Sequence, residues 1–132
     1  MSASPDPQNG FRILLVEDAA PVARIFALLL EKLGHQTAVA TDGRAALDQI
    51  RELHPEIIFS DISMPGMSGY EFAQQIRAVP DWKSIVLVAL TGYSQEEDRQ
   101  KALDAGFDLH LTKPADLSQL DAVFALAAKR RG

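Results

Sequence analysis

The stretch Ile57-Ile-Phe-Ser-Asp-Ile-Ser-Met-Pro-Gly-Met-Ser-Gly69 indicates how the rest of the chain is organised. It begins with a continuous apolar run rich in β-branched residues, which is typical of a strand buried on both faces. Asp61 follows this run, and Ser68 with Glu71 three residues later has the pattern of a helix-starting capping box. Open α/β sheets bind ligands at the carboxyl ends of their strands, where Asp61 is predicted to lie. Alone, Asp61 is explained equally well as a turn residue that bonds to its own loop.

Length and composition limit the classes of protein that the chain can belong to. Its 132 residues, 47% hydrophobic and 23% charged, suit one globular domain with a single core. The formal net charge of −5 argues against a surface for nucleic acid or anionic membranes. The absence of cysteine excludes disulfides and thiolate metal sites. The longest apolar run, Ile25 to Leu30, is too short to cross a membrane, and residues 1–10 lack a signal-peptide pattern. We therefore expect a cytoplasmic protein with a flexible lead-in over residues 1–10.

Strand and helix patterns alternate along the rest of the chain. Short, mostly apolar runs predict strands at residues 12–16, 36–40, 57–60, 85–90 and 109–112. A helical pattern follows each run, and Ser94 and Asp116 are predicted to cap the last two helices. In the first helix, an apolar stripe is predicted to face the core: Val22, Ile25, Phe26, Leu29 and Leu33. Five such strand–helix units predict a parallel sheet with helices on both faces, although the pattern does not give the strand order.

Polar residues follow four of the five predicted strands. Glu17 and Asp18 follow the first strand, Asp61 the third, Thr91 the fourth and Lys113 the fifth. Parallel strands end at one edge of the sheet, so these side chains are expected to meet there. Three converging carboxylates repel one another unless a cation neutralises them, and a site with few oxygen ligands is the kind that Mg²⁺ prefers. A lysine and a hydroxyl are suitable donors to a phosphate. Each residue alone has an ordinary structural explanation, but their joint arrival at one edge does not.

These residues give the chain a resemblance to the receiver domain of bacterial two-component response regulators. The matching motifs are Glu17-Asp18, the Asp61 segment quoted above, Thr91-Gly92 and Lys113-Pro114, in a match that runs from about Phe11 to Leu126. The resemblance implies an α/β flavodoxin-like fold: a (βα)5 three-layer sandwich whose parallel sheet has the strand order 2-1-3-4-5. It also implies a receiver domain over residues 11–128, followed by a short C-terminal tail at residues 129–132.

The resemblance implies a signalling phosphoacceptor rather than an enzyme with a separate substrate. Asp61 would accept a phosphoryl group from a histidine of a kinase or of a phosphotransfer protein, while Lys113 and Thr91 would bind phosphoryl oxygens. Mg²⁺ would have four protein ligands: Glu17, Asp18, Asp61 and the backbone carbonyl of Ser63. The face of the fourth helix, fifth strand and fifth helix would carry the signal to a partner protein. Neither nucleic acid nor membrane is an expected partner, and the protein is expected to be a monomer or a weak dimer.

The sequence departs from the usual receiver pattern at one position. The switch aromatic of the family, Tyr or Phe three residues before the lysine, is replaced here by His110. One interpretation is a smaller switch ring whose charge depends on pH. The other is a partly buried histidine without a signalling role, and the sequence leaves both open.

Three other functions are compatible with parts of the pattern. An aspartyl phosphatase of the haloacid-dehalogenase type carries a second aspartate two residues after the first, where this chain has Ser63. A pseudo-receiver, which binds partners without phosphorylation, would be favoured by loss of Asp61 or Lys113, and both are present. A flavin or nucleotide module would need a Gly-rich turn, which residues 17–21 lack. The expected context is a stand-alone regulator or a receiver from a larger protein such as a hybrid histidine kinase.

Overall fold

Strands and helices alternate in the computed structural model. It describes residues 10–64, 66–92, 96–113 and 117–131; for residues 96–98 and 117 it describes the backbone but not the side chain. The strands are β1 (Arg12–Val16), β2 (Gln36–Ala40), β3 (Ile57–Asp61), β4 (Val86–Thr91) and β5 (Leu109–Thr112). The helices are α1 (Ala20–Lys32), α2 (Gly43–Leu53), α3 (Gly69–Arg77), α4 (Glu96–Ala105) and α5 (Leu117–Arg131), and a 3-10 turn, η1 (Pro80–Trp82), follows α3. The predicted caps Ser94 and Asp116, like Pro114, lie outside the described residues.

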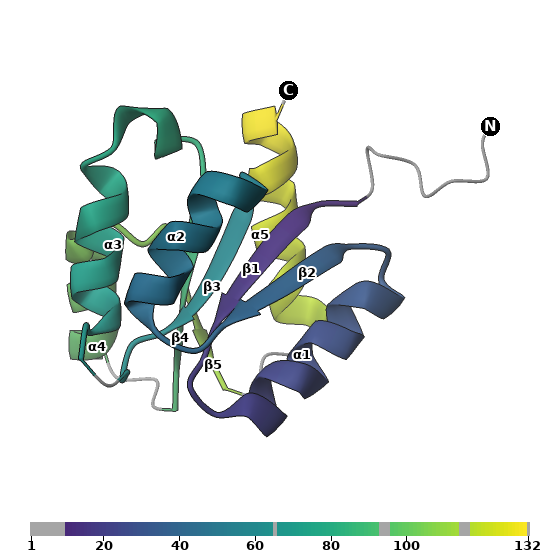
Figure 1. Ribbon diagram of the computed structural model, residues 1–132, viewed down its shortest axis with the longest axis horizontal. Helices are drawn as coiled ribbons and strands as arrows, with labels where there is room; N and C mark the ends of the chain where they lie inside the picture. The colour runs from purple at the N-terminus through teal and green to yellow at the C-terminus, as the bar shows by residue number, and fades with distance from the viewer. Residues whose placement is uncertain (1–9, 65, 93–95, 114–116, 132) are drawn as a thin grey trace.

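The five strands form one parallel sheet in the order β2-β1-β3-β4-β5. This order and the alternation with helices confirm the flavodoxin-like fold (Figure 1). Along the chain, β2 is placed on one side of β1 and β3 on the other, so the order of the strands reverses between β1 and β3. Open α/β sheets form their ligand crevice at such a point. The predicted strand boundaries agree with the structure to within one residue, and β3 extends through Asp61.

The core consists of two apolar layers, one on each face of the sheet. Successive residues of a strand alternate between the layers, so that Leu14 and Ile58 belong to the layer under α2, α3 and α4. Leu15 and Phe59 belong to the layer under α1 and α5. All four side chains are almost completely buried, which explains why the central strands are apolar throughout. Figure 1 shows the sheet between the two groups of helices.

The predicted core face of α1 is wrong in part. Ala23, Ala27 and Leu30 are buried, whereas Ile25 is 71% exposed. Val22 and Leu33 of the predicted stripe are also exposed. The helix is apolar around most of its circumference, so the spacing of large residues does not identify the buried side. Alanines allow the helix axis to approach the sheet closely, and this packing outweighs the burial of larger side chains.

Residues 129–131, predicted to be a C-terminal tail, form the last turn of α5. Arg131 donates from Nε to Glu56 at 2.7 Å and from one NH2 group to the carbonyl of Gly10 at 2.7 Å. Its guanidinium also lies 4.4 Å from the centre of the Phe11 ring. These contacts tie the end of α5 to the start of β1. The three basic residues thus lie at the negative C-terminal end of the helix dipole, where cations are favourable.

Candidate functional site

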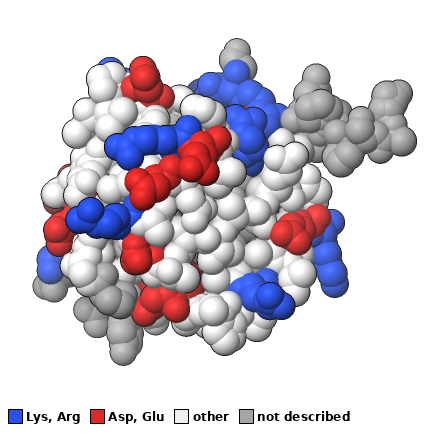
Figure 2. Space-filling model, in the orientation of Figure 1, with Lys and Arg blue, Asp and Glu red and all other residues white. Residues whose placement is uncertain are grey.

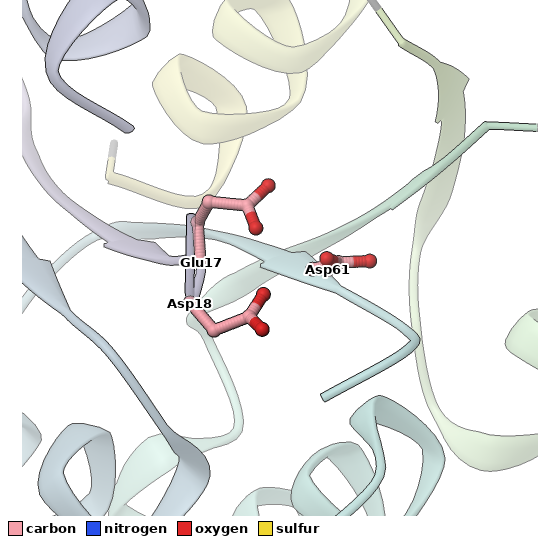
Figure 3. Close-up of side chains that lie close together, drawn as sticks. All are labelled: Glu17, Asp18 and Asp61. Carbon is pink, nitrogen blue, oxygen red and sulfur yellow. The ribbon is translucent and has the colours of Figure 1, made fainter. Parts of the chain in front are cut away.

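Three carboxylates meet at the carboxyl edge of the sheet. Glu17 and Asp18 directly follow β1, and Asp61 is the last residue of the neighbouring strand β3. The register pairs Val16 with Ser60, so the two strands end at the same level. One ligand oxygen from each carboxylate lies within 4.8 Å of the others, as the close-up in Figure 3 illustrates. Glu17 and Asp61 are buried and Asp18 is exposed, so the cluster opens to solvent on the Asp18 side.

The loop after Asp61 holds this carboxylate in place. The N–H of Ser63 donates to Oδ1 of Asp61 at 3.1 Å, and the N–H of Gly69 donates to the carbonyl of Ile62 at 2.8 Å. The predicted capping box of Ser68 is present at the start of α3. A Cβ atom on Gly69 would lie 2.6 Å from the backbone oxygen of Asp61, so only glycine allows α3 to begin this close to the strand end.

Lys113 joins two of the carboxylates. Its Nζ donates to Oε1 of Glu17 at 2.6 Å and lies 3.2 Å from Oδ2 of Asp61. Burial alone would lower the pKa of Lys113, but the hydrogen bonds and negative charges of Glu17 and Asp61 outweigh burial and raise it. The ammonium is therefore charged over the whole physiological range. Sequence reasoning predicted that Lys113 would approach this edge but did not predict Glu17 as its nearest partner.

The charge of the cluster fits a divalent cation. Three carboxylates against one ammonium give the cluster a formal net charge of −2. All three side chains offer hard oxygen ligands, and the exposed Asp18 leaves space for water ligands, both of which suit Mg²⁺. The acidic cluster predicted from sequence is thus confirmed as a spatial cluster. The carbonyl of Ser63 as a fourth ligand stays a prediction, although the N–H of this residue already contacts Asp61.

Thr91 and His110 meet beside the cluster. Thr91, the last residue of β4, is buried, and its Oγ1 lies 2.9 Å from Nε2 of His110 on β5. The Thr91 carbonyl accepts from the N–H of Lys113 at 2.7 Å, so the ends of β4 and β5 are connected. Sequence reasoning named Thr91 as a residue that binds a phosphoryl oxygen and moves on phosphorylation, and His110 as the residue at the switch position of the family, without predicting that they touch. Strand register, which places them diagonally across β4 and β5, could not be obtained from the pattern.

Comparison with known proteins identifies the class that this fold and site define. Residues 13–125 match the family model of the response regulator receiver domain. The chain therefore belongs to this family, whose members are signalling phosphoacceptors in two-component systems.

Curated relatives place the same domain in longer proteins. Probable histidine kinase 2 of Oryza sativa subsp. indica is 37% identical over 126 residues, which cover 83% of this chain and 12% of the kinase. The phosphate regulon transcriptional regulatory protein PhoB of Escherichia coli (strain K12) is 35% identical over 119 residues, which cover 90% of this chain and 52% of PhoB. The chain thus spans from about one eighth to about half of the length of these two relatives.

Solved structures of a response regulator and of receiver domains show the same fold. A putative response regulator from Chloroflexus aurantiacus J-10-fl superposes with a TM-score of 0.85 at 27% identity, covering 90% of this chain and 98% of that one. The receiver domain of sensor histidine kinase PA1611 from Pseudomonas aeruginosa PAO1, with magnesium coordinated in its active-site cleft, gives 0.81 at 28% identity, covering 91% and 98%. The receiver domain of Ssk1 from Saccharomyces cerevisiae, crystallised with the histidine phosphotransfer protein Ypd1, gives 0.80 at 29% identity, covering 89% and 88%.

Surface charge and helix length give two further observations. Figure 2 shows basic and acidic side chains on the same face, with a group of basic side chains gathered near the C-terminal end of α5, whose last turn carries Lys129, Arg130 and Arg131. Within the described part of the chain, no helix combines the length and apolar character needed to span a bilayer.

Proposed function

We propose that Asp61 is the phosphoacceptor of this receiver domain. The observation that carries the proposal is the position of its carboxylate, which ends the strand at the switch point of the sheet and lies 3.2 Å from Lys113 beside two further carboxylates. An Asp61 oxygen attacks the phosphorus of a phosphohistidine, and the P–N bond breaks. The leaving electron pair returns to the imidazole nitrogen, which takes up a proton. Lys113 then pairs with a phosphoryl oxygen, and the Thr91 hydroxyl donates to another.

Glu17, Asp18, Asp61 and the Ser63 carbonyl would hold Mg²⁺ at this site. When bound, the ion neutralises the negative charge of the transferring phosphoryl group. Glu17 would have a second task, because its Oε1 accepts a hydrogen bond from Nζ of Lys113 at 2.6 Å. This contact would keep the lysine at the edge of the sheet where Asp61 lies, 3.2 Å from Oδ2 of Asp61. In this interpretation Glu17 links the metal ligands to the phosphoryl-binding cation.

The donor would be a histidine kinase or a histidine phosphotransfer protein. The relatives of this chain include a probable histidine kinase, and one structural neighbour was crystallised with a histidine phosphotransfer protein. Both observations support a donor of this class. We expect the response to be carried by the face of α4, β5 and α5, and the domain to act in the cytoplasm. The domain would stand alone or form part of a larger regulator or hybrid kinase.

Intact mass spectrometry after incubation with acetyl phosphate and Mg²⁺ tests the proposal. One added phosphoryl group is expected on the wild-type protein, and none on Asp61→Asn or after removal of Mg²⁺ by EDTA. Asp121→Asn, on α5, is the matched control and should be labelled like the wild type. Labelling that persists in Asp61→Asn would assign the acceptor to another residue. Absence of labelling by acetyl phosphate, followed by absence of labelling from a phosphorylated histidine phosphotransfer protein, would favour a phosphorylation-independent receiver.

A further inference from the structure

The side of α1 that faces away from the sheet is unusually apolar. Val22, Ile25 and Leu28 are 48%, 71% and 53% exposed, respectively. Ala23 and Ala27, which pack on the sheet, are buried. Four of the seven large apolar side chains that are exposed in the described part of the chain belong to α1 or to the residue that ends it. Single exposed apolar residues are common on soluble proteins, but a cluster of them on one helix marks an interaction surface.

These side chains have the spacing of a helix–helix contact. Val22 and Leu28 lie three residues before and after Ile25. Pro21 and Leu29 lie four residues before and after it. Residues three or four apart share one face of a helix, and this alternation is the pattern of a coiled-coil seam. The stripe is apolar in both directions from Ile25, so it is complementary to a second copy of itself that runs antiparallel. In such a pair the two Ile25 side chains meet on a two-fold axis, and Val22 of each copy lies against Leu28 of the other.

A cavity beside this stripe can accept a side chain of the second copy. It has a volume of about 420 Å³ and lies between α1 and strands β1, β3 and β4. The residues that α1 contributes to its wall are Val22, Ala23, Ile25, Phe26 and Leu29. Every other described residue of the wall is apolar except Glu17 and Lys113. An apolar side chain that enters the cavity removes apolar surface from water on both copies, which is the main favourable term in association.

The two ends of α1 carry opposite charge. The carboxylate cluster, with its formal charge of −2, lies at the N-terminal end, and its exposed member Asp18 is seven residues before Ile25. Lys32 is exposed in the last turn, seven residues after Ile25, and forms no ion pair within the described part of the chain. Antiparallel pairing therefore brings Lys32 of each copy to the cluster of the other copy, twice by symmetry. A parallel pair would instead place cluster beside cluster and Lys32 beside Lys32.

We propose that α1 is the interface of an antiparallel homodimer, with Ile25 on the two-fold axis and Lys32 of each copy beside Asp18 of the other. A helix of 13 residues is about 20 Å long, so one helix face buries less than the roughly 800 Å² per partner of a standard interface. The dimer is therefore weak and depends on protein concentration. Mg²⁺ bound at the carboxylate cluster would neutralise the charge that attracts Lys32, so Mg²⁺ binding and dimerisation oppose each other reciprocally. This coupling rests on the proposed metal ligands, whereas the interface itself does not.

Analytical ultracentrifugation over a wide range of protein concentrations measures the dimer. The weight-average mass of the wild type should rise with concentration toward twice that of the monomer. Ile25→Glu should remain monomeric over the same range, because it places two carboxylates against each other on the two-fold axis. Ile25 is exposed, so this substitution should leave the urea midpoint nearly unchanged, which verifies that the variant is folded. Leu103→Glu, at an exposed apolar position on α4, is the matched control and should dimerise like the wild type.

Crosslinking and Mg²⁺ test the geometry of the pair. The chain has no cysteine, so a single Ile25→Cys substitution should give a disulfide-linked dimer under mild oxidation, and Leu103→Cys should give far less. Saturating Mg²⁺ should weaken dimerisation of the wild type about five-fold, the effect of two exposed ion pairs, relative to NaCl of equal ionic strength. Lys32→Gln should weaken it by a similar factor and remove the response to Mg²⁺.

The outcomes separate this inference from the proposed function. A wild type that stays monomeric, or an Ile25→Glu variant that dimerises like the wild type, would overturn the interface. Loss of the dimer in Leu103→Glu alone would assign the contact to another face and would also overturn it. An equal dimerisation constant with and without Mg²⁺, in a protein shown to bind Mg²⁺, would overturn the contact between Lys32 and Asp18. The monomeric Ile25→Glu variant should still be labelled by acetyl phosphate, so the phosphoacceptor role of Asp61 stands or fails independently of the dimer.

Discussion

Asp108 offers the sharpest test of what stabilises this fold. It lies just before β5, at the edge of the sheet opposite the carboxylate cluster. Its Oδ2 accepts from an NH2 group of Arg77 at 2.8 Å and from the N–H of Leu87 at 2.9 Å. Its two carboxylate oxygens also accept from Arg130 at 2.8 and 2.9 Å. One carboxylate thus joins α3, β4 and α5 to the start of β5.

The expected cost of Asp108→Ala follows from these contacts. The Asp108 side chain is 17% exposed and that of Arg77 is 23% exposed, so the substitution leaves a largely buried guanidinium without its carboxylate. Breaking a buried ion pair costs about 3–5 kcal/mol. Arg77 keeps hydrogen bonds to the carbonyls of Gly106 and Ile85, and Arg130 can be hydrated, which favours the lower end of that range. We therefore expect the free energy of unfolding to fall by about 3 kcal/mol, or the midpoint temperature by roughly 10 °C.

Urea unfolding followed by circular dichroism measures this loss by linear extrapolation. Asp104→Ala is the matched control, because this exposed aspartate on α4 bonds only to Gln100 among the partners that the structure describes for its side chain. Asp104→Ala should change the free energy of unfolding by no more than about 0.5 kcal/mol. A loss below about 1 kcal/mol for Asp108→Ala would refute the reasoning, because it would mean that hydration replaces the carboxylate at almost no cost.

Three further predictions concern the metal site, the loop after β3 and pH. Mg²⁺ at ten times its dissociation constant should stabilise the wild type against urea by about 1.4 kcal/mol, and Asp18→Asn should reduce this gain at the same Mg²⁺ concentration; an equal gain in both would remove Asp18 from the ligand set. Gly69→Ala should lower the free energy of unfolding by more than about 2 kcal/mol, because its Cβ would meet backbone atoms at 2.6 and 2.7 Å, whereas Gly92→Ala, whose Cβ would have no described atom within 4 Å, should have little effect on the urea midpoint. Burial, followed by the nearby charge of Arg131, lowers the pKa of His35, so the unfolded chain binds more protons just below pH 6.5 and stability should rise with pH through that window. His35→Asn, which can keep an acceptor for the N–H of Phe11, should flatten this pH dependence in urea unfolding between pH 5 and 7.5.

Much of the site could be predicted because a parallel sheet brings strand ends together. Residues 12–16 and 57–60 were both predicted to be buried strands of one parallel sheet. Glu17, Asp18 and Asp61, which follow these strands, were therefore expected at the same edge of that sheet. The structure confirms this cluster. The capping box of Ser68 could also be predicted from the sequence, since it depends on residues three positions apart. Predictions of this kind succeed because the physical cause is local or follows from the period of a single element.

The contacts that the sequence did not reveal depend on register and on packing between distant segments. The buried side of α1 was misjudged because nearly every side of that helix is apolar, and only close packing of Ala23 and Ala27 on the sheet selects one. The bond between Thr91 and His110 requires the diagonal register of β4 and β5. The bridge from Arg131 to Glu56 spans 75 residues of sequence.

The alternation of strands and helices, the acidic edge of the sheet and, through its motifs, the receiver family could all be obtained from the amino-acid sequence. Hydrophobic periodicity and the polar residues at strand ends depend only on residues close together in the chain, so they can be recognised without any knowledge of the fold. Tertiary structure alone decided which carboxylate holds Lys113, where the hydroxyl of Thr91 points, and how the end of α5 is attached to β1. Those choices depend on distances between segments far apart in the chain, which are set only when both layers of the core pack against the sheet at once.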